Sequence, residues 1–158
     1  RSNSRDGGTA HSMAITDLFD LPPSGPLVGI DPGSKTLGIA ACDAGRLIAS
    51  PVETIRKGRK LAPSLDRLFE IMDQRHTVGL VIGLPLNMDG TEGPRAKLTR
   101  DFGEALAEAT GIQVHMHDER LTSFEAEQRM RGTSRRTKKE HADAVAACVL
   151  LESWLESL

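Results

Sequence analysis

Residues 29–40, GIDPGSKTLGIA, place a carboxylate, Asp31, at the end of an apolar run and follow it at once with a Pro-Gly turn. The preceding residues, LVGID at 27–31, are typical of a buried strand, and LGIAACD at 37–43 predicts a second strand joined to it by a tight turn. A carboxylate at the end of a buried strand is costly to desolvate unless a cation neutralises it. The stretch therefore predicts a strand pair that carries an acidic group where functional sites are built.

The segments that follow predict a mixed sheet with helices. RLIASPVETI at 46–55 would complete an antiparallel meander of three strands, and apolar residues recur at helical spacing over 61–74. VGLVIGLP at 78–85 is apolar throughout, as expected for a central strand covered on both faces.

The second half continues with a helix, a fifth strand and two more helices. The helix carries an apolar stripe over 98–109 and ends at Gly111, and IQVHMH at 112–117 predicts the strand. Thr122 and Glu125 form a capping box for the third helix, and 141–158 predicts the last. The resulting order, βββαβαβαα, is that of the ribonuclease H-like fold, an α/β fold in which a mixed five-stranded sheet is flanked by helices.

Length and composition predict one domain in the cytoplasm. The chain has 158 residues and a net charge of −2, so any affinity for nucleic acid must come from local patches. We expect residues 27–158 to form the domain and 1–26 to be a disordered leader and linker, with 1–12 an added segment before a natural start at Met13. Both cysteines lie among small apolar residues, which favours reduced thiols in the cytoplasm, and no apolar run is long enough to span a membrane.

Three carboxylates are predicted to meet at one end of the sheet. Asp31 ends the first strand, Glu119 follows the fifth, and Asp143 lies in the first turns of the last helix. Asp118 is an alternative to Glu119, because either could cap the strand or pair with Arg120. Converging acids without matching bases imply a divalent metal, and oxygen ligands suit Mg²⁺ or Mn²⁺. Such ions could support phosphodiester hydrolysis with all three residues as catalytic metal ligands.

Four motifs resemble the YqgF/RuvX family of pre-16S ribosomal RNA nucleases, which are relatives of RuvC-type Holliday junction resolvases. The motifs are GIDPGSKTLGIA, VIGLPLNMDGTEG, HDERLTS and DAVAA, in the expected order over about 27–155. The resemblance implies a ribonuclease H-like fold, divalent-metal nuclease activity and a cytoplasmic role in trimming the 5′ end of the small-subunit rRNA precursor. Asp31, Glu119 and Asp143 match the acidic positions of the family.

The resemblance also suggests a fourth acid. Glu140 precedes Asp143 by three residues, one helical turn on the same face, and RuvC-type resolvases carry a second acid at that offset. We therefore expect Glu140 to be an auxiliary metal ligand. The segment before Asp143, TKKEHAD, is less continuously basic than the family pattern.

Basic residues near the acids are predicted to bind nucleic-acid phosphates. The expected contacts are Lys35, Arg129, Arg131, Arg135, Arg136, Lys138 and Lys139. A second basic run, RKGRK at 56–60, follows the third strand, and the loop GLPLNMDGTEG at 83–93 could offer backbone N–H groups to a phosphate or be an ordinary loop.

Three alternative functions were considered. The substrate could be branched DNA rather than precursor rRNA, as for a Holliday junction resolvase. The sequence does not decide between a monomer and a homodimer. A non-catalytic RNA-binding or transcription-associated factor would have no reason to retain clustered carboxylates. A phosphotransferase related to the actin-like kinases would need a second domain and a second phosphate loop, for which the chain is too short.

Overall fold

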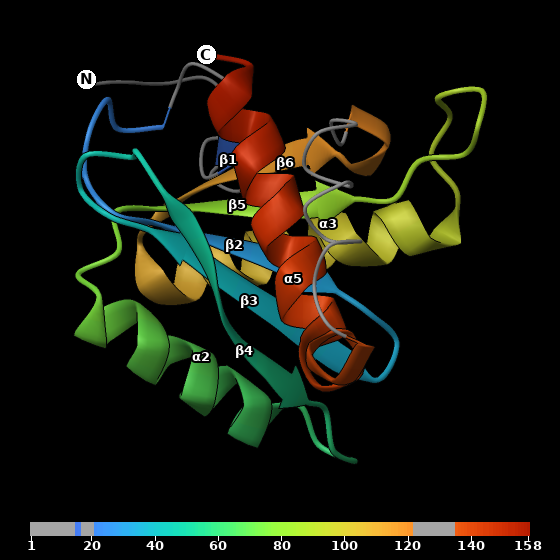
Figure 1. Cartoon of the computed structure of the whole chain (residues 1–158). Helices are drawn as coiled ribbons and strands as arrows, with labels where there is room; N and C mark the ends of the chain where they lie inside the picture. The colour runs from blue at the N-terminus through green and yellow to red at the C-terminus, as the bar shows by residue number, and fades with distance from the viewer. Residues whose placement is uncertain (1–14, 17–20, 122–134) are drawn as a thin grey trace.

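The protein forms a six-stranded sheet flanked by helices (Figure 1). The computed structural model describes residues 15–16, 21–121 and 135–158, with the backbone alone at 15–16, 121 and 135–141. The elements in chain order are β1 Ile15–Thr16, β2 Leu27–Pro32, β3 Thr36–Cys42, β4 Ala49–Arg56, α2 Ala62–Gln74, β5 Gly79–Leu84, α3 Pro94–Thr110, β6 Gln113–Asp118, the 3₁₀ turn η2 Glu119–Leu121, and α5 Arg135–Glu156. The described helices include none whose length and hydrophobicity would let it span a lipid bilayer.

The strand order β1-β6-β5-β2-β3-β4 joins a parallel half to an antiparallel half. β2 pairs with β3 and β3 with β4 in antiparallel fashion, whereas β2 pairs with β5 and β5 with β6 in parallel. The meander followed by two crossovers confirms the five-strand arrangement that the sequence predicts. β2 thus lies at the centre of the sheet, between β3 and β5.

Two parts of the expected leader and linker at 1–26, residues 15–16 and 21–26, are described, and both contact the rest of the domain. β1 adds a sixth strand by pairing in parallel with Val114 and His115 of β6. Leu21 is buried in the core, because it packs with Leu27 and other apolar residues below α5. Arg46 fixes the linker by donating hydrogen bonds to the carbonyl oxygens of Pro22 and Gly25, at 2.6 and 3.0 Å. Residues 1–14 and 17–20 lie outside the described residues.

Among the described helices, α2 and α3 agree with the expectation and α5 begins earlier than expected. α3 ends as predicted at Gly111, whose positive φ of 72° allows the left-handed cap. α5 begins at Arg135, six residues before the expected start at His141. The predicted helix at Thr122 and Glu125 lies outside the described residues.

Alternation along the strands gives the sheet two buried faces. Val28 and Ile30 of β2 belong to the larger core, which is covered by α2 and α3. Leu27 belongs to the core below α5, and Gly29 also faces that helix. In Figure 1, α5 crosses one face of the sheet while α2 and α3 lie on the other. By the same period of two, Asp31 lies on the α5 face.

α5 approaches the sheet closely because glycines lie beneath it. A Cβ on Gly38 of β3 would overlap the backbone carbonyl of Asp143, and one on Gly29 would lie 3.1 Å from Cβ of Leu151. On β5, a Cβ on Gly83 would lie 3.2 Å from Cδ2 of Leu150. Any side chain at Gly38 would therefore push the first part of α5 away from the sheet.

The Gly38→Ala variant is expected to lose about 2 kcal/mol or more of stability, because the added methyl group meets a rigid backbone rather than a flexible side chain. Urea unfolding followed by circular dichroism measures this change. Gly58→Ala is the matched control, since a Cβ at Gly58 would approach only the Lys60 carbonyl oxygen, at 3.9 Å. Equal stabilities of the two variants would contradict the role assigned to Gly38.

Candidate active site

Asp31 lies half-buried at the end of the central strand, one residue before β2 ends. Burial, followed by the negative charges of Glu119 and Asp143, raises the pKa of its carboxyl group from 3.8 to about 6, and the positive charge of Arg95 opposes this rise. Two acids distant in sequence thus act on one carboxyl group. In the folded chain, Glu119 and Asp143 are therefore close enough to Asp31 to influence its ionisation.

Glu119 reaches the site from the end of β6. β5 lies between β2 and β6, and a Cβ on Gly83 of β5 would lie 3.7 Å from Oε1 of Glu119. Since Ile30 pairs with Ile82, the following residues, Asp31 and Gly83, stand side by side at this edge of the sheet. The Glu119 carboxylate therefore lies beside Gly83, next to the end of β2 that carries Asp31.

Asp118, the alternative to Glu119, has a structural partner. Its carboxylate forms an ion pair with Arg120, with Nη2 and Oδ2 2.8 Å apart, and also accepts a hydrogen bond from the Arg120 backbone N–H. The hydrogen bonds from the Arg120 side chain hold the pKa of Asp118 below its usual value. The geometry therefore favours Glu119 over Asp118 as the acid that faces Asp31.

Asp143 is positioned by the two antiparallel strands below α5. The Thr36 hydroxyl donates a 2.6 Å hydrogen bond to Oδ2 of Asp143, and the Thr54 hydroxyl accepts a 3.2 Å bond from the backbone N–H of Ala144. Gly38, which pairs with Asp31 across the sheet, lies directly below the Asp143 backbone. Packing and side-chain hydrogen bonds thus fix this part of α5 over the end of β2.

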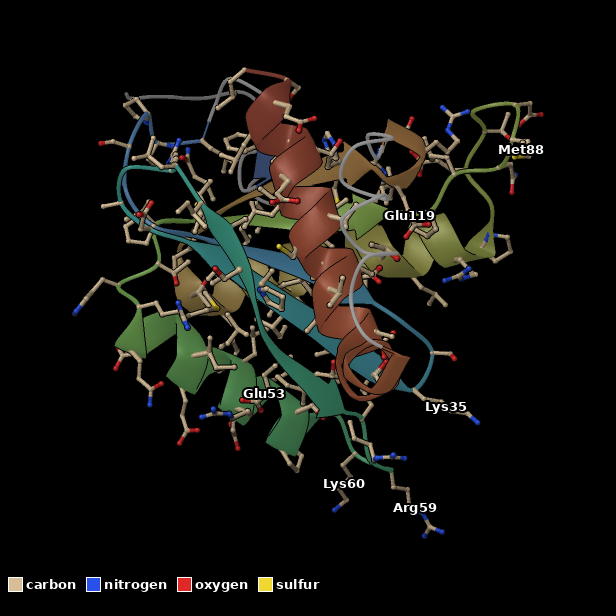
Figure 2. All side chains as sticks on the ribbon, in the orientation of Figure 1. Lys35, Glu53, Arg59, Lys60, Met88 and Glu119 are labelled. Atoms are coloured by element: carbon tan, nitrogen blue, oxygen red, sulfur yellow. The ribbon has the colours of Figure 1, made fainter. Side chains whose placement is uncertain are left out.

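The loop between β5 and α3 is held by its own hydrogen bonds and by Arg120. The Asn87 N–H donates to the Thr91 carbonyl at 2.9 Å, and the Asp89 carboxylate accepts from both the N–H and the hydroxyl of Thr91. Arg120 donates to the Met88 carbonyl at 3.1 Å and so ties the loop to the turn that carries Glu119. Figure 2 shows Met88 at the outer end of this loop and Glu119 nearer to α5.

The predicted basic residues are only partly described. Lys35 lies exposed in the turn between β2 and β3, and its carbonyl accepts a 2.8 Å hydrogen bond from the Lys57 N–H, which brings the 56–60 run beside it. Lys35, Arg59 and Lys60 extend outward in Figure 2. Arg129 and Arg131 lie outside the described residues, and Arg135, Arg136, Lys138, Lys139 and Glu140 are described as backbone of α5 only.

The chemistry of the three acids fits a hard divalent cation. Their oxygen atoms are the donors that Mg²⁺ and Mn²⁺ prefer, and a bound cation would offset the negative charges of Glu119 and Asp143 that act on Asp31. Among the described residues, however, no group of three or more Asp, Glu, His or Cys side chains forms a ready-made metal site. The acids are therefore electrostatic neighbours rather than a completed coordination shell.

Two residues that contribute to the site were not identified from the sequence. Thr36 lies two residues before Gly38 on β3, so strand alternation places it on the α5 face and could have revealed it. Arg95 of α3 acts on Asp31 from an element on the other face of the sheet, and neither spacing nor motif indicates this. Only the fold brings its charge to the end of β2.

The family model and the relatives found by sequence comparison point to the same protein family. The model of the family described as "RuvX: Holliday junction resolvase" matches residues 25–157. A protein of Cereibacter sphaeroides (strain ATCC 17025 / ATH 2.4.3) named "Putative pre-16S rRNA nuclease" is 44% identical over 150 residues, which cover 94% of this chain and 93% of that protein. A protein of the same name from Ruegeria pomeroyi is 41% identical over 140 residues, covering 87% of this chain and 90% of that one.

Solved structures share the fold at low sequence identity. The T. thermophilus RuvC in complex with a Holliday junction substrate has a TM-score of 0.56 and 16% identity, covering 84% of this chain and 96% of that one. The yeast mitochondrial Holliday junction resolvase has a TM-score of 0.52 and 10% identity, covering 87% of this chain and 80% of its own. These similarities confirm the predicted ribonuclease H-like fold.

The Asp31→Asn variant is expected to stabilise the metal-free protein at neutral pH but not in acid. Because the folded state binds the Asp31 proton more tightly than the unfolded state, ionisation costs stability as the pH rises from 3.8 through about 6. A shift of the pKa from 3.8 to about 6 means that ionised Asp31 lowers the free energy of unfolding by at most about 3 kcal/mol above that pH range. Below that range the effect is almost zero. Urea unfolding with a chelator, at about pH 4 and about pH 8, measures the difference.

Asp101→Asn is the control for this comparison, because Asp101 is exposed on α3. It should leave stability nearly unchanged at both pH values. A gain from Asp31→Asn of the same size in acid and at neutral pH would contradict the electrostatic origin of the effect.

Proposed function

This chain belongs to the RuvX family, and we propose that it is a divalent-metal-dependent nuclease that uses Asp31, Glu119 and Asp143 to hydrolyse phosphodiester bonds. The observation that carries the proposal is geometric: Asp31 lies at the end of the central strand, the Glu119 carboxylate lies beside Gly83 of the next strand, and the Asp143 backbone lies over Gly38, which pairs with Asp31. Such a cluster is costly in a protein that only binds RNA, so it argues against a non-catalytic role.

The three acids are proposed to hold Mg²⁺ or Mn²⁺, with Glu140 as an auxiliary ligand. When bound, these ions would polarise a water molecule and neutralise the negative charge that develops on the phosphate. Asp31 supplies a carboxylate on a rigid strand, whereas Thr36 orients the Asp143 carboxylate by its hydrogen bond. Glu140 lies one helical turn before Asp143 on α5, which supports its inclusion.

We assign precursor 16S rRNA as the substrate and the cytoplasm as the place of action. The names of the relatives from Cereibacter sphaeroides and Ruegeria pomeroyi support the substrate assignment. Branched DNA is the second candidate, because the family description refers to Holliday junctions. A junction resolvase presents two sites to one substrate, so that candidate requires a dimer, whereas a trimming nuclease can act as a monomer.

Asp31→Asn is expected to lower RNA cleavage by about a thousandfold or more, because the transition state gathers charge that a weakened metal site no longer neutralises. Glu119→Gln and Asp143→Asn should have effects of similar size, and Glu140→Gln a smaller one. The assay uses an end-labelled RNA with a 5′ precursor extension, with Mg²⁺, Mn²⁺ or a chelator. Fully paired DNA and four-way DNA junctions are tested in parallel.

Asp118→Asn is the matched control, because Asp118 neighbours Glu119 in sequence but pairs with Arg120. It should retain much more activity than Glu119→Gln. Wild-type cleavage by Asp31→Asn, or cleavage that survives the chelator, would overturn the proposed mechanism. Cleavage of junctions but not of RNA would replace the substrate assignment and leave the mechanism intact.

The basic residues Arg135, Arg136, Lys138 and Lys139 are proposed to bind phosphates, since they lie on the turns of α5 that precede Asp143. Replacing them by Ala should weaken binding to all sequences. The slope of log Kobs against log salt concentration should fall by about one unit for each phosphate that the variant no longer neutralises. Fluorescence anisotropy over a salt series measures the slope, and an unchanged slope with intact affinity would refute this role.

A further inference from the structure

A pocket of about 440 Å³ opens beside the end of β2, on the face of the sheet that α3 covers. Pro32 and Gly33, which directly follow Asp31, form part of its wall. The volume falls in the usual range of sites for small organic groups, roughly 300–1,000 Å³. The pocket therefore adjoins the proposed cleavage site but is not part of the carboxylate cluster.

The lining of the pocket combines an apolar interior with positive charge. Leu37, Leu61, Leu98 and Phe102 supply apolar surface, and Lys57 and Arg95 supply the charges. None of the described residues that line the pocket is an Asp or Glu. An apolar, partly aromatic cavity with cations and no anions complements a flat ring attached to a phosphate, which is the chemistry of a nucleotide.

Two observations connect the pocket to the proposed reaction. Arg95 lines the pocket together with Pro32 and Gly33, the two residues that directly follow Asp31, so this cation lies near the end of β2. Leu98 is 69% exposed and Leu61 43% exposed, which leaves apolar surface at the pocket available to a ligand. A phosphate held between Arg95 and the carboxylate cluster would bring its attached base to this pocket.

We propose that the pocket takes one unpaired base of the substrate strand, next to the phosphodiester bond that is cut, with Phe102 and Leu98 against the base and Lys57 and Arg95 on the flanking phosphates. This inference rests on the proposed nuclease function. It adds a substrate requirement, because a base in a continuous duplex would first have to leave its stack. Single-stranded or frayed segments therefore bind more tightly than a fully paired duplex.

The test is a cycle that combines a protein variant with an RNA lacking one base. Asp31→Asn is the background throughout, so that binding is measured without cleavage. Leu98→Gln should weaken binding of a short single-stranded RNA by about fivefold, the low end of what stacking of one base contributes. An abasic site, moved along the RNA one position at a time, should reproduce this effect at one position, and Leu98→Gln should cost nothing further there.

Leu47→Gln is the matched control, since Leu47 is 85% exposed in the turn between β3 and β4 and does not line the pocket. It should leave RNA affinity unchanged. Because Leu98 and Leu47 are both exposed, neither variant should alter the melting temperature of the protein. Binding of a fully paired duplex should be insensitive to Leu98→Gln.

The outcomes separate this inference from the proposed function. If the protein binds RNA and wild-type protein cleaves it, but Leu98→Gln has no effect or no abasic position removes its effect, the pocket is not a base site and the nuclease proposal stands. If binding depends on Leu98 as described but no cleavage is found, the pocket is a base-binding site, whereas the nuclease proposal and the placement of that base next to a cleaved bond both fail. If neither RNA nor junction DNA binds at all, both proposals are overturned.

Discussion

The close approach of α5 to the sheet is the constraint on which the site depends. Asp31 and Glu119 belong to the ends of two strands, but Asp143 reaches them only because the helix lies almost on the backbone of β3 at Gly38. The hydrogen bond from Thr36 to Asp143 also depends on this close approach, because it would be lost if α5 lay farther from the sheet. Because Gly38 has no side chain, α5 can lie close enough to the sheet for the Asp143 carboxylate to approach the strand ends.

That arrangement is electrostatically unfavourable, and the rest of the fold has to compensate for it. Burial and two neighbouring acids work against ionisation of Asp31, with Arg95 as the described charge that opposes them. The compensation comes from apolar cores on both faces of the sheet, in which residues such as Ile30, Leu80 and Leu151 are fully buried. Clustered charge of this kind is a common feature of functional sites, where stability is given up for reactivity.

Local patterns predicted the strands of the meander, β5, β6, α2 and α3 well, because each depends on short-range spacing, whereas the roles of the three acids remain predictions. The Pro-Gly turn after Asp31, strand alternation and Gly111 as a helix cap are all visible in a few consecutive residues. The edge strand at Ile15 was missed because two paired residues leave no periodicity, and Arg95 because its effect on Asp31 arises only when distant segments pack together. The choice of Glu119 over Asp118 likewise needed the Arg120 ion pair, which spacing alone left ambiguous.

The separation of the acids along the chain has a consequence for synthesis. Thr36 and Asp143 form a hydrogen bond across 107 positions, so a ribosome must complete most of the chain before the third acid can dock. Until then β2 and β3 can pair with each other but have no helix over the α5 face, and that apolar face is open to aggregation or chaperone binding. Interactions of such long range also slow folding, because chain entropy is given up before they form. Under the proposed role of Asp143, a nascent chain that still lacks α5 would not cleave nucleic acid.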